Sequence, residues 1–200
     1  MGRPLASAAT ATPERLLDAA EQGFARTGFG ATRLEDIAAV AGIRRPSLLY
    51  HYASKDELYA AVVHRSFHRL GAALMAAMAR QVSFPERVDG VVDTYAQFLA
   101  DNPAPAQIMV RELLGGDGPG HEILLAAVVP LLDVVERFVR VEGHALIRPG
   151  LPVRAAILQV ASGILLRSAA GSLRVPLWGP IDHARALARL LFFPSTKATP

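Results

Sequence analysis

The chain of 200 residues contains no cysteine. Disulfide frameworks, thiolate zinc sites and cysteine nucleophiles are therefore excluded. Because nothing in the composition indicates an oxidising compartment, we expect the protein in the cytoplasm.

Long hydrophobic runs are also missing. The two longest apolar stretches, residues 123–135 and 155–166, are interrupted by Pro130 and Asp133 or by Gln159 and Ser162. Both fall short of the roughly 18 to 20 residues that a membrane-spanning helix needs, so we expect no membrane association. The first fifteen residues lack the apolar segment of a secretory signal, and we expect residues 1–11 to form a disordered arm.

Lysine is nearly absent, since Lys55 and Lys197 are the only two. The net charge is +3. An excess this small does not by itself indicate a nucleic-acid partner, because such proteins usually concentrate their charge on one face. Any prediction of DNA binding must therefore rest on local patterns.

Sustained alternation of apolar and polar residues is absent as well, which predicts an all-α protein. Apolar residues make up 52% of the chain, enough for a sizeable core. We expect helices at 13–28, 33–42, 44–52, 55–80, from 83 to a break at 102–103, 104–114, 120–142, 152–170 and 180–192. The long fourth helix joins a domain at 12–70 to a domain at 71–193, with their boundary near residues 69–72 and a tail at 194–200.

Two capping boxes bracket a short segment. Thr32 with Glu35 and Ser54 with Glu57 match the pattern in which a hydroxyl and a carboxylate satisfy free backbone N–H groups at a helix start. Gly42 ends the helix that begins at the first box. Two short helices joined by a glycine-containing turn form a helix-turn-helix, which we predict for residues 33–52.

The second helix of such a motif lies in the major groove of DNA, and its first residues meet the base edges. Arginine pairs well with guanine there. The residues expected on this face are Arg44, Arg45, Ser47 and Tyr50. The starts of neighbouring helices favour phosphate, and there we expect Thr32, Arg33 and Lys55 to contact the DNA backbone.

About fifty residues, from Pro13 to Val62, form a pattern with fixed spacing across four expected helices. Its members are Leu16, Leu17, Asp18, Ala19, Ala20, Phe24, Gly28, Phe29, Ala31, Thr32, Ile37, Ala38, Ala41, Gly42, Ile43, Ser47, Leu48, His51, Tyr52, Ser54, Lys55, Glu57 and Leu58. This pattern resembles the signature of the TetR/AcrR family of transcriptional regulators position for position.

The resemblance implies a homodimeric, ligand-responsive repressor that binds a near-palindromic operator. An N-terminal domain would bind DNA, and a divergent C-terminal domain would bind a small-molecule inducer and dimerise. By the family pattern, Arg45, Pro46, Tyr50 and His51 match positions on the recognition helix, and Lys55 matches a phosphate-binding lysine. The resemblance implies no cofactor and no enzymatic activity.

Two residues depart from the family pattern. Leu49 stands where a tyrosine is usual, so one phosphate contact is missing or is made by Tyr50. Arg44 stands where a small polar N-cap is usual, and an arginine cannot cap as serine does, at a cost on the order of 1 kcal/mol. Among the adjacent rings, we expect Tyr50 outward and Tyr52 inward, with either orientation open for His51.

Two further sets concern the C-terminal domain. Adaptable apolar side chains suit an inducer pocket, although ordinary core packing explains them equally well. They are Leu74, Met75, Met78, Tyr95, Phe98, Met109 and Leu113. Apolar residues on the last two helices suit a four-helix dimer interface, although an internal hairpin is the alternative. They are Ile157, Val160, Ala161, Ile164, Leu165, Ser168, Leu187, Leu190 and Leu191.

The competing interpretation is a helical enzyme or ligand carrier that retains a helix-turn-helix shape. Its acid-base groups would come from Asp36, Asp56, Asp93, Glu112 and His121, none of which has diagnostic spacing. The segment 115–120 lacks the Lys-Ser/Thr ending of a phosphate-binding loop. His64 and His68 stand four residues apart without a third ligand, so we predict no metal site.

Overall fold

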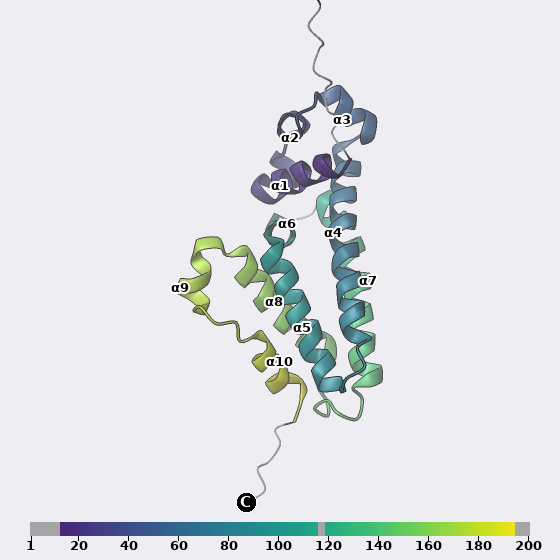
Figure 1. Cartoon of the computed structure of the whole chain (residues 1–200), viewed down its shortest axis with the longest axis vertical. Helices are drawn as coiled ribbons and strands as arrows, with labels where there is room; N and C mark the ends of the chain where they lie inside the picture. The colour runs from purple at the N-terminus through teal and green to yellow at the C-terminus, as the bar shows by residue number, and fades with distance from the viewer. Residues whose placement is uncertain (1–12, 116–118, 195–200) are drawn as a thin grey trace, which may run out of the picture.

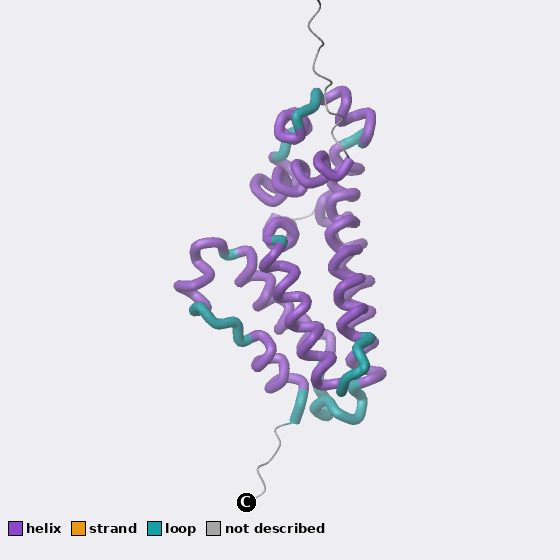
Figure 2. The backbone as a smooth tube through the Cα atoms, in the orientation of Figure 1, coloured by secondary structure: helices purple, strands orange, loops and turns teal. Residues whose placement is uncertain are grey.

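The computed structural model describes residues 13–115 and 119–194 of the chain. The expected arm at 1–11 and residues 195–200 of the expected tail lie outside these ranges. Within them the fold is all-α, as predicted, with helices joined by short loops and no strand (Figure 2).

The helices follow one another closely along the chain. They are α1 (Pro13–Ala31), α2 (Leu34–Ala41), α3 (Arg45–His51), α4 (Lys55–Met78), α5 (Phe84–Asp101), α6 (Pro103–Gly115), α7 (Pro119–Glu142), α8 (Val153–Ala169), the 3₁₀ turn η1 (Gly171–Leu173), α9 (Arg174–Trp178) and α10 (Ala184–Phe192). Most bounds agree closely with the prediction. The sequence did not predict η1 and α9.

The two long helices α4 and α7 pack side by side along the longest axis of the molecule (Figure 1). The short helices α2 and α3 lie at one end of α4, and α1 crosses beside them. Helix α6 packs against α1, while α5, α8 and α10 pack together below it. The body around α1 to α3 is thus held to the rest by both α4 and α6.

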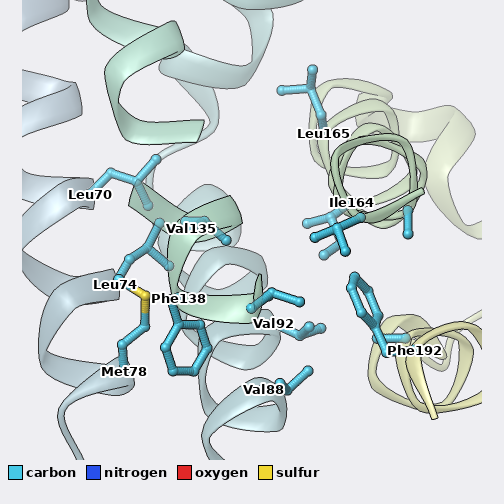
Figure 3. Packing of buried hydrophobic residues seen from close by; sticks show 14 of the residues in the cluster. Leu70, Leu74, Met78, Val88, Val92, Val135, Phe138, Ile164, Leu165 and Phe192 are labelled. Atoms are coloured by element: carbon cyan, nitrogen blue, oxygen red, sulfur yellow. The ribbon is translucent and has the colours of Figure 1, made fainter. Parts of the chain in front are cut away.

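Two hydrophobic cores occupy the two ends. The N-terminal core contains Leu16, Phe24, Ile37, Leu48, Leu58 and Tyr59, together with Ala104, Ile108 and Leu124 from α6 and α7. The C-terminal core contains Leu70, Leu74, Val92, Val135, Phe138, Ile164 and Phe192 (Figure 3). Phe67 packs against both, so α4 passes from one core to the other near that residue.

Two helix ends differ in detail from the prediction. Gly28 has φ +80° and breaks α1 as expected, but the helix resumes for a last turn to Ala31. The last helix begins at Ala184 and not at Pro180: its N-cap His183 makes no side-chain cap bond, while the Asp182 carboxylate accepts from the Ala184 N–H at 2.8 Å. The start of α5 is a complete capping box between Ser83 and Glu86.

Polar contacts hold α1 against α4. Arg65 donates to the Asp18 carboxylate at 2.7 Å and to Glu21 at 3.2 Å. The hydroxyl of Ser66, buried on α4, donates to the same Glu21. These contacts join the helix that supports the helix-turn-helix to the helix that runs into the C-terminal core.

Among the described residues, no single helix has the length and apolar content of a membrane span. The pair Val153–Ala169 and Gly171–Trp178 passes that test when taken together, with a bend of 115° at the break.

Candidate nucleic-acid interface and central cavity

The turn between α2 and α3 is fixed by glycine. Gly42 has φ +75°, its N–H donates to the Ala39 carbonyl at 3.1 Å, and the Ile43 N–H donates to the Ala38 carbonyl at 2.9 Å. This pair of bonds is a Schellman motif, which ends a helix sharply and needs a left-handed residue. The predicted stop at Gly42 is confirmed, and it places α3 immediately after a tight corner.

Helix α3 divides cleanly into an inner and an outer side. Leu48 is fully buried, while Leu49 and Tyr52 pack partly buried against the N-terminal core. Burial also raises the pKa of the Tyr52 hydroxyl, and the charge of Arg65 partly offsets this. The inward orientation expected for Tyr52 is confirmed.

The outer side presents polar and aromatic groups to solvent. Tyr50 is 88% exposed, as expected for an outward side chain, and its ring lies 5.6 Å from that of His51. His51 also proves to be exposed. The complete set of exposed residues from the N-cap onward is Arg44, Arg45, Pro46, Ser47, Tyr50 and His51. All six were predicted to contact DNA.

Two arginines at the corner are without partners among residues 13–115 and 119–194. Arg33 is the N-cap of α2 and Arg44 is the N-cap of α3, and neither side chain caps its helix. Both are exposed and make no ion pair or side-chain hydrogen bond within the part of the chain that the structure describes. Their charges are therefore available to an external anion.

Arg45 has a partner that the sequence did not reveal. Its Nε lies 2.8 Å from Glu35 Oε1, and both side chains are more than half exposed. An ion pair this exposed contributes little stability, about 0 to 1 kcal/mol, so solvent or DNA can replace it. Glu35 therefore orients Arg45 across the α2–α3 corner and does not cap α2.

The capping box predicted for Thr32 and Glu35 is wrong. Thr32 is only 5% exposed, and its hydroxyl donates to the Gly28 carbonyl at 2.6 Å and lies 2.7 Å from the Thr27 hydroxyl. The Gly28 carbonyl also accepts from the Thr32 N–H at 3.3 Å, so both donors of Thr32 point back to the break at Gly28. A hydroxyl occupied in this way does not reach a phosphate, so its predicted contact with DNA is not supported.

Lys55, the predicted phosphate contact, faces the α1–α2 corner. Its Nζ donates to the carbonyl oxygens of Gly30 at 3.1 Å and Thr32 at 3.3 Å, and it lies 4.7 Å from the centre of the Phe29 ring. An ammonium group has three donors, so one remains for a phosphate. Lys55 therefore also fixes the corner that carries Arg33.

The second predicted capping box is half confirmed. The Ser54 hydroxyl accepts from the Glu57 N–H at 3.1 Å, as expected of an N-cap. The Glu57 carboxylate instead accepts from the Ala53 N–H at 2.9 Å, one residue earlier than the pattern implies. The effect is the same, since α4 begins directly after α3.

The C-terminal core borders a partly open cavity of about 520 Å³, which we term the central cavity. Its walls come from α4, α5, α6, α7, α8 and α10. Figure 3 shows Leu70, Leu74 and Val135 on one side of this region and Ile164, Leu165 and Phe192 on the other. Of the predicted pocket residues, Leu74, Tyr95, Met109 and Leu113 line the cavity.

The other predicted pocket residues do not line it. Met75 is exposed, Met78 is buried in the core, and Phe98 packs against the core without reaching the cavity. The wall that α7 supplies was not predicted from the sequence; it consists of Val128, Leu131, Leu132, Val135, Phe138 and Val139. Their spacing of three and four residues was the available signal, but core residues have the same spacing.

The predicted dimer residues separate into two groups. Ile164 and Leu165 are buried in the chain's own core, while Ile157, Val160 and Ala161 line the central cavity. Ile164 and Leu165 are therefore used within the chain, whereas Ile157, Val160 and Ala161 are half-buried and their contact with a second chain stays a prediction. Leu191 and Ser168 are half-buried, and only Leu187 and Leu190 on α10 are largely exposed, at 60% and 67%.

Large apolar side chains are exposed on α8, α9 and α10. They are Leu158 and Leu166 on α8, Val175, Leu177 and Trp178 on α9, and Leu187 and Leu190 on α10. Together we term these seven residues the exposed apolar set. Helix α8 contacts both α9 and α10, so the set belongs to one part of the molecule.

The candidate acid-base groups of the competing interpretation lie on five different helices. Asp93 on α5 forms a bidentate ion pair with Arg185. Glu112 on α6 lies near Tyr59, whose pKa is raised by burial and further by that carboxylate. His64 and His68 stack at 5.9 Å, and no group of three metal-binding side chains occurs within the described ranges.

Comparison with known proteins agrees with this geometry. Residues 16–62 match the family model described as bacterial regulatory proteins, tetR family. An uncharacterised HTH-type transcriptional regulator of Mycobacterium tuberculosis is 33% identical over 117 residues, which is 58% of this chain and 58% of that protein. The chain thus matches less than two thirds of the length of this relative.

Solved structures extend the likeness over nearly the whole fold. A tetR-family regulatory protein from Rhodococcus RHA1 is 24% identical with a TM-score of 0.71, covering 94% of this chain and all of that one. The regulator FadR from Bacillus subtilis, solved with stearoyl-CoA, is 14% identical with a TM-score of 0.73, covering 89% and 96%. Residues 16–62 therefore carry the sequence pattern of the tetR family of bacterial regulatory proteins, and the fold of the described residues is similar to that of solved tetR-like regulators.

Proposed function

We propose that the protein is a DNA-binding transcriptional regulator that acts as a ligand-responsive repressor. The observation that carries this proposal is the outer side of α3, where six exposed residues include Arg44, Arg45 and Tyr50. Every large apolar side chain of α3 faces inward, so the outer side is free to enter a major groove. We propose that Arg45 reads a base and that Arg33 and Lys55 contact phosphates.

The DNA-bound form is proposed to be a homodimer. Helices α8 to α10 expose seven large apolar residues, and monomeric proteins rarely leave extended apolar surface uncovered. A twofold pairing is the commonest way to cover such a surface with identical chains. It would present two copies of α3 to successive major grooves about 34 to 36 Å apart on a near-palindromic operator.

The central cavity is the proposed binding site for the small-molecule effector. The relative FadR was solved with stearoyl-CoA, which shows that a protein of this fold holds a ligand with a long acyl chain. In this chain the cavity volume lies within the range of about 300 to 1,000 Å³ that is usual for ligand sites. A ligand that favours another spacing of the two α3 helices would release DNA.

Arg111 is the proposed link from the cavity to the DNA-binding domain. It lies on α6 between Met109 and Leu113, which both line the cavity. Its Nε donates to the Ala25 carbonyl at 2.7 Å and its Nη2 to the Arg26 carbonyl at 2.6 Å. A shift of α6 would therefore move α1 directly.

A gel-shift assay with duplexes from upstream of the protein's own gene tests the function. We expect a retarded complex of two chains per duplex, and Arg33→Ala should weaken binding to all sequences while lowering the salt slope by about 1.8, because each chain loses one phosphate contact. Arg137→Ala is the control, because Arg137 is an exposed arginine on α7. Failure of the unaltered protein to bind any duplex selected from a random pool would favour a ligand carrier instead.

A further inference from the structure

The wall of the central cavity holds no charged side chain. Leucine, valine, isoleucine, phenylalanine, methionine and alanine make up all of it except Tyr95, Gln159 and Ser162. Aspartate, glutamate, lysine, arginine and histidine are absent from the described residues that line it. A ligand inside the cavity would therefore find nothing to neutralise a charge.

An unpaired charge in such surroundings carries a large cost. Moving an isolated carboxylate or ammonium group from water into an apolar interior is unfavourable by several kcal/mol or more, unless a partner is present. Charged groups of a ligand must consequently remain outside the cavity or be absent. The desolvation cost is much smaller for a neutral hydroxyl that makes one hydrogen bond inside the cavity.

Tyr95 is the polar group best placed to supply that hydrogen bond. It lies on α5, packs against the C-terminal core, and its hydroxyl makes no hydrogen bond with another described residue. Burial raises the pKa of Tyr95, so the hydroxyl keeps its proton. Ser162, by contrast, already donates to the Gln159 carbonyl at 3.2 Å, and both residues are exposed on α8.

The cavity is elongated along the helices that enclose it. The lining residues of α7 run from Val128 to Val139 and those of α8 from Ala155 to Leu165. At a rise of 1.5 Å per residue, each stretch covers about 15 Å of helix. That length suits an extended aliphatic chain better than a compact ring.

We propose that the central cavity binds an uncharged, extended and mainly aliphatic molecule with one hydrogen-bonding group, and that Tyr95 selects this group. The inference rests on the proposal that the cavity is the effector site. It adds the chemical class of the ligand and the residue that recognises its polar end.

Isothermal titration calorimetry with three chain-matched probes tests the ligand class. At pH 7 the full-length protein should bind 1-decanol at least 10-fold more tightly than decanoate or decylammonium, because only the alcohol is neutral. Equal or tighter binding of either ion would overturn the proposal, and so would the absence of measurable binding for all three.

Two variants test the roles of Tyr95 and the cavity. Tyr95→Phe should lower the affinity for 1-decanol by about 2- to 12-fold, the equivalent of 0.5 to 1.5 kcal/mol for one hydrogen bond. The affinity of this variant for toluene, which has no hydrogen-bonding group, should stay unchanged. A merely structural role of Tyr95 would lower the affinity for both probes. Ala161→Leu should lower the affinity for both probes, because the larger side chain reduces the cavity volume. Val91→Leu replaces it if the first variant does not fold.

Gel shifts without probe separate this inference from the proposed function. If the protein binds DNA but prefers decanoate, the proposed function stands and the proposed ligand class fails. A protein that prefers 1-decanol but binds no DNA would retain the ligand class, and the regulator proposal would fail.

Discussion

At the scale of single residues, similar sequence patterns lead to different contacts. Ser83 and Glu86 form the reciprocal capping box that their spacing predicts, whereas Thr32 and Glu35 do not. The difference lies in Gly28, whose positive φ breaks α1 and whose carbonyl accepts from both the hydroxyl and the N–H of Thr32. A hydroxyl bonds to the nearest unsatisfied group, and only the folded backbone decides which group that is.

Substitution of Thr32 by valine tests whether its hydroxyl stabilises the fold or contacts a DNA phosphate. Thr32→Val should lower the free energy of unfolding by about 0.5 to 1.5 kcal/mol, because one hydrogen bond to the half-buried Gly28 carbonyl is lost while the Thr32 N–H still donates to it. Urea denaturation measures this, with the exposed Ser47→Ala as a control that should change stability little. Normal stability combined with weaker DNA binding would show that the hydroxyl contacts DNA after all.

At the scale of helices and turns, the sequence predicted what depends on local geometry. Helix bounds from α2 to α8 follow from caps, glycines and prolines, which act within a few residues. The inner face of α8 was not predictable, because apolar residues surround this helix and include both buried Ile164 and exposed Leu166. Its orientation depends on packing with α5 and α10, which lie far away in the sequence.

The corner at Gly42 should tolerate no side chain without strain. Gly42→Ala should destabilise the protein by about 1 kcal/mol, because an L-residue at φ +75° brings its Cβ against the following carbonyl. Gly30→Ala is the matched control, since a Cβ there meets no atom within 4 Å and its φ is not positive. Equal midpoints of urea unfolding for the two variants would contradict the Schellman corner.

The contact of α6 with α1 should be visible in hydrogen exchange. Arg111→Ala removes two hydrogen bonds from a charged donor to the Ala25 and Arg26 carbonyls, each worth about 1.5 to 3 kcal/mol. Amides in the last turns of α1 should therefore exchange at least 10-fold faster, while those of α8 keep their rates. Uniform acceleration in both helices would indicate global destabilisation and no specific link.

At the scale of the whole molecule, the two cores and the exposed apolar set define how the parts would work together. Helix α4 enters both cores, and α6 reaches from the cavity to α1. The N-terminal core takes Ala104, Ile108 and Leu124 from beyond the boundary expected at residues 69–72. The cavity wall was not predictable from the sequence, because lining and core residues are chemically alike. The proposed dimer depends on surfaces that only the arrangement of α8 to α10 reveals.

Charges on the exposed side of α10 should prevent dimerisation. Leu187→Asp combined with Leu190→Asp should yield monomers in sedimentation analysis, because each aspartate would be desolvated at an apolar interface. Leu125→Asp, at an exposed position on α7, is the control and should leave the dimer intact. A double variant that remains dimeric would exclude α10 from the interface.

The central claim is that the outer side of α3 reads the base sequence of an operator. Affinities of the unaltered protein and of Arg45→Ala should be compared on an operator duplex and on a scrambled duplex at the same salt concentration. The account predicts a loss of about 1 to 3 kcal/mol on the operator and a much smaller loss on scrambled DNA. Equal losses on both duplexes would contradict base reading by Arg45.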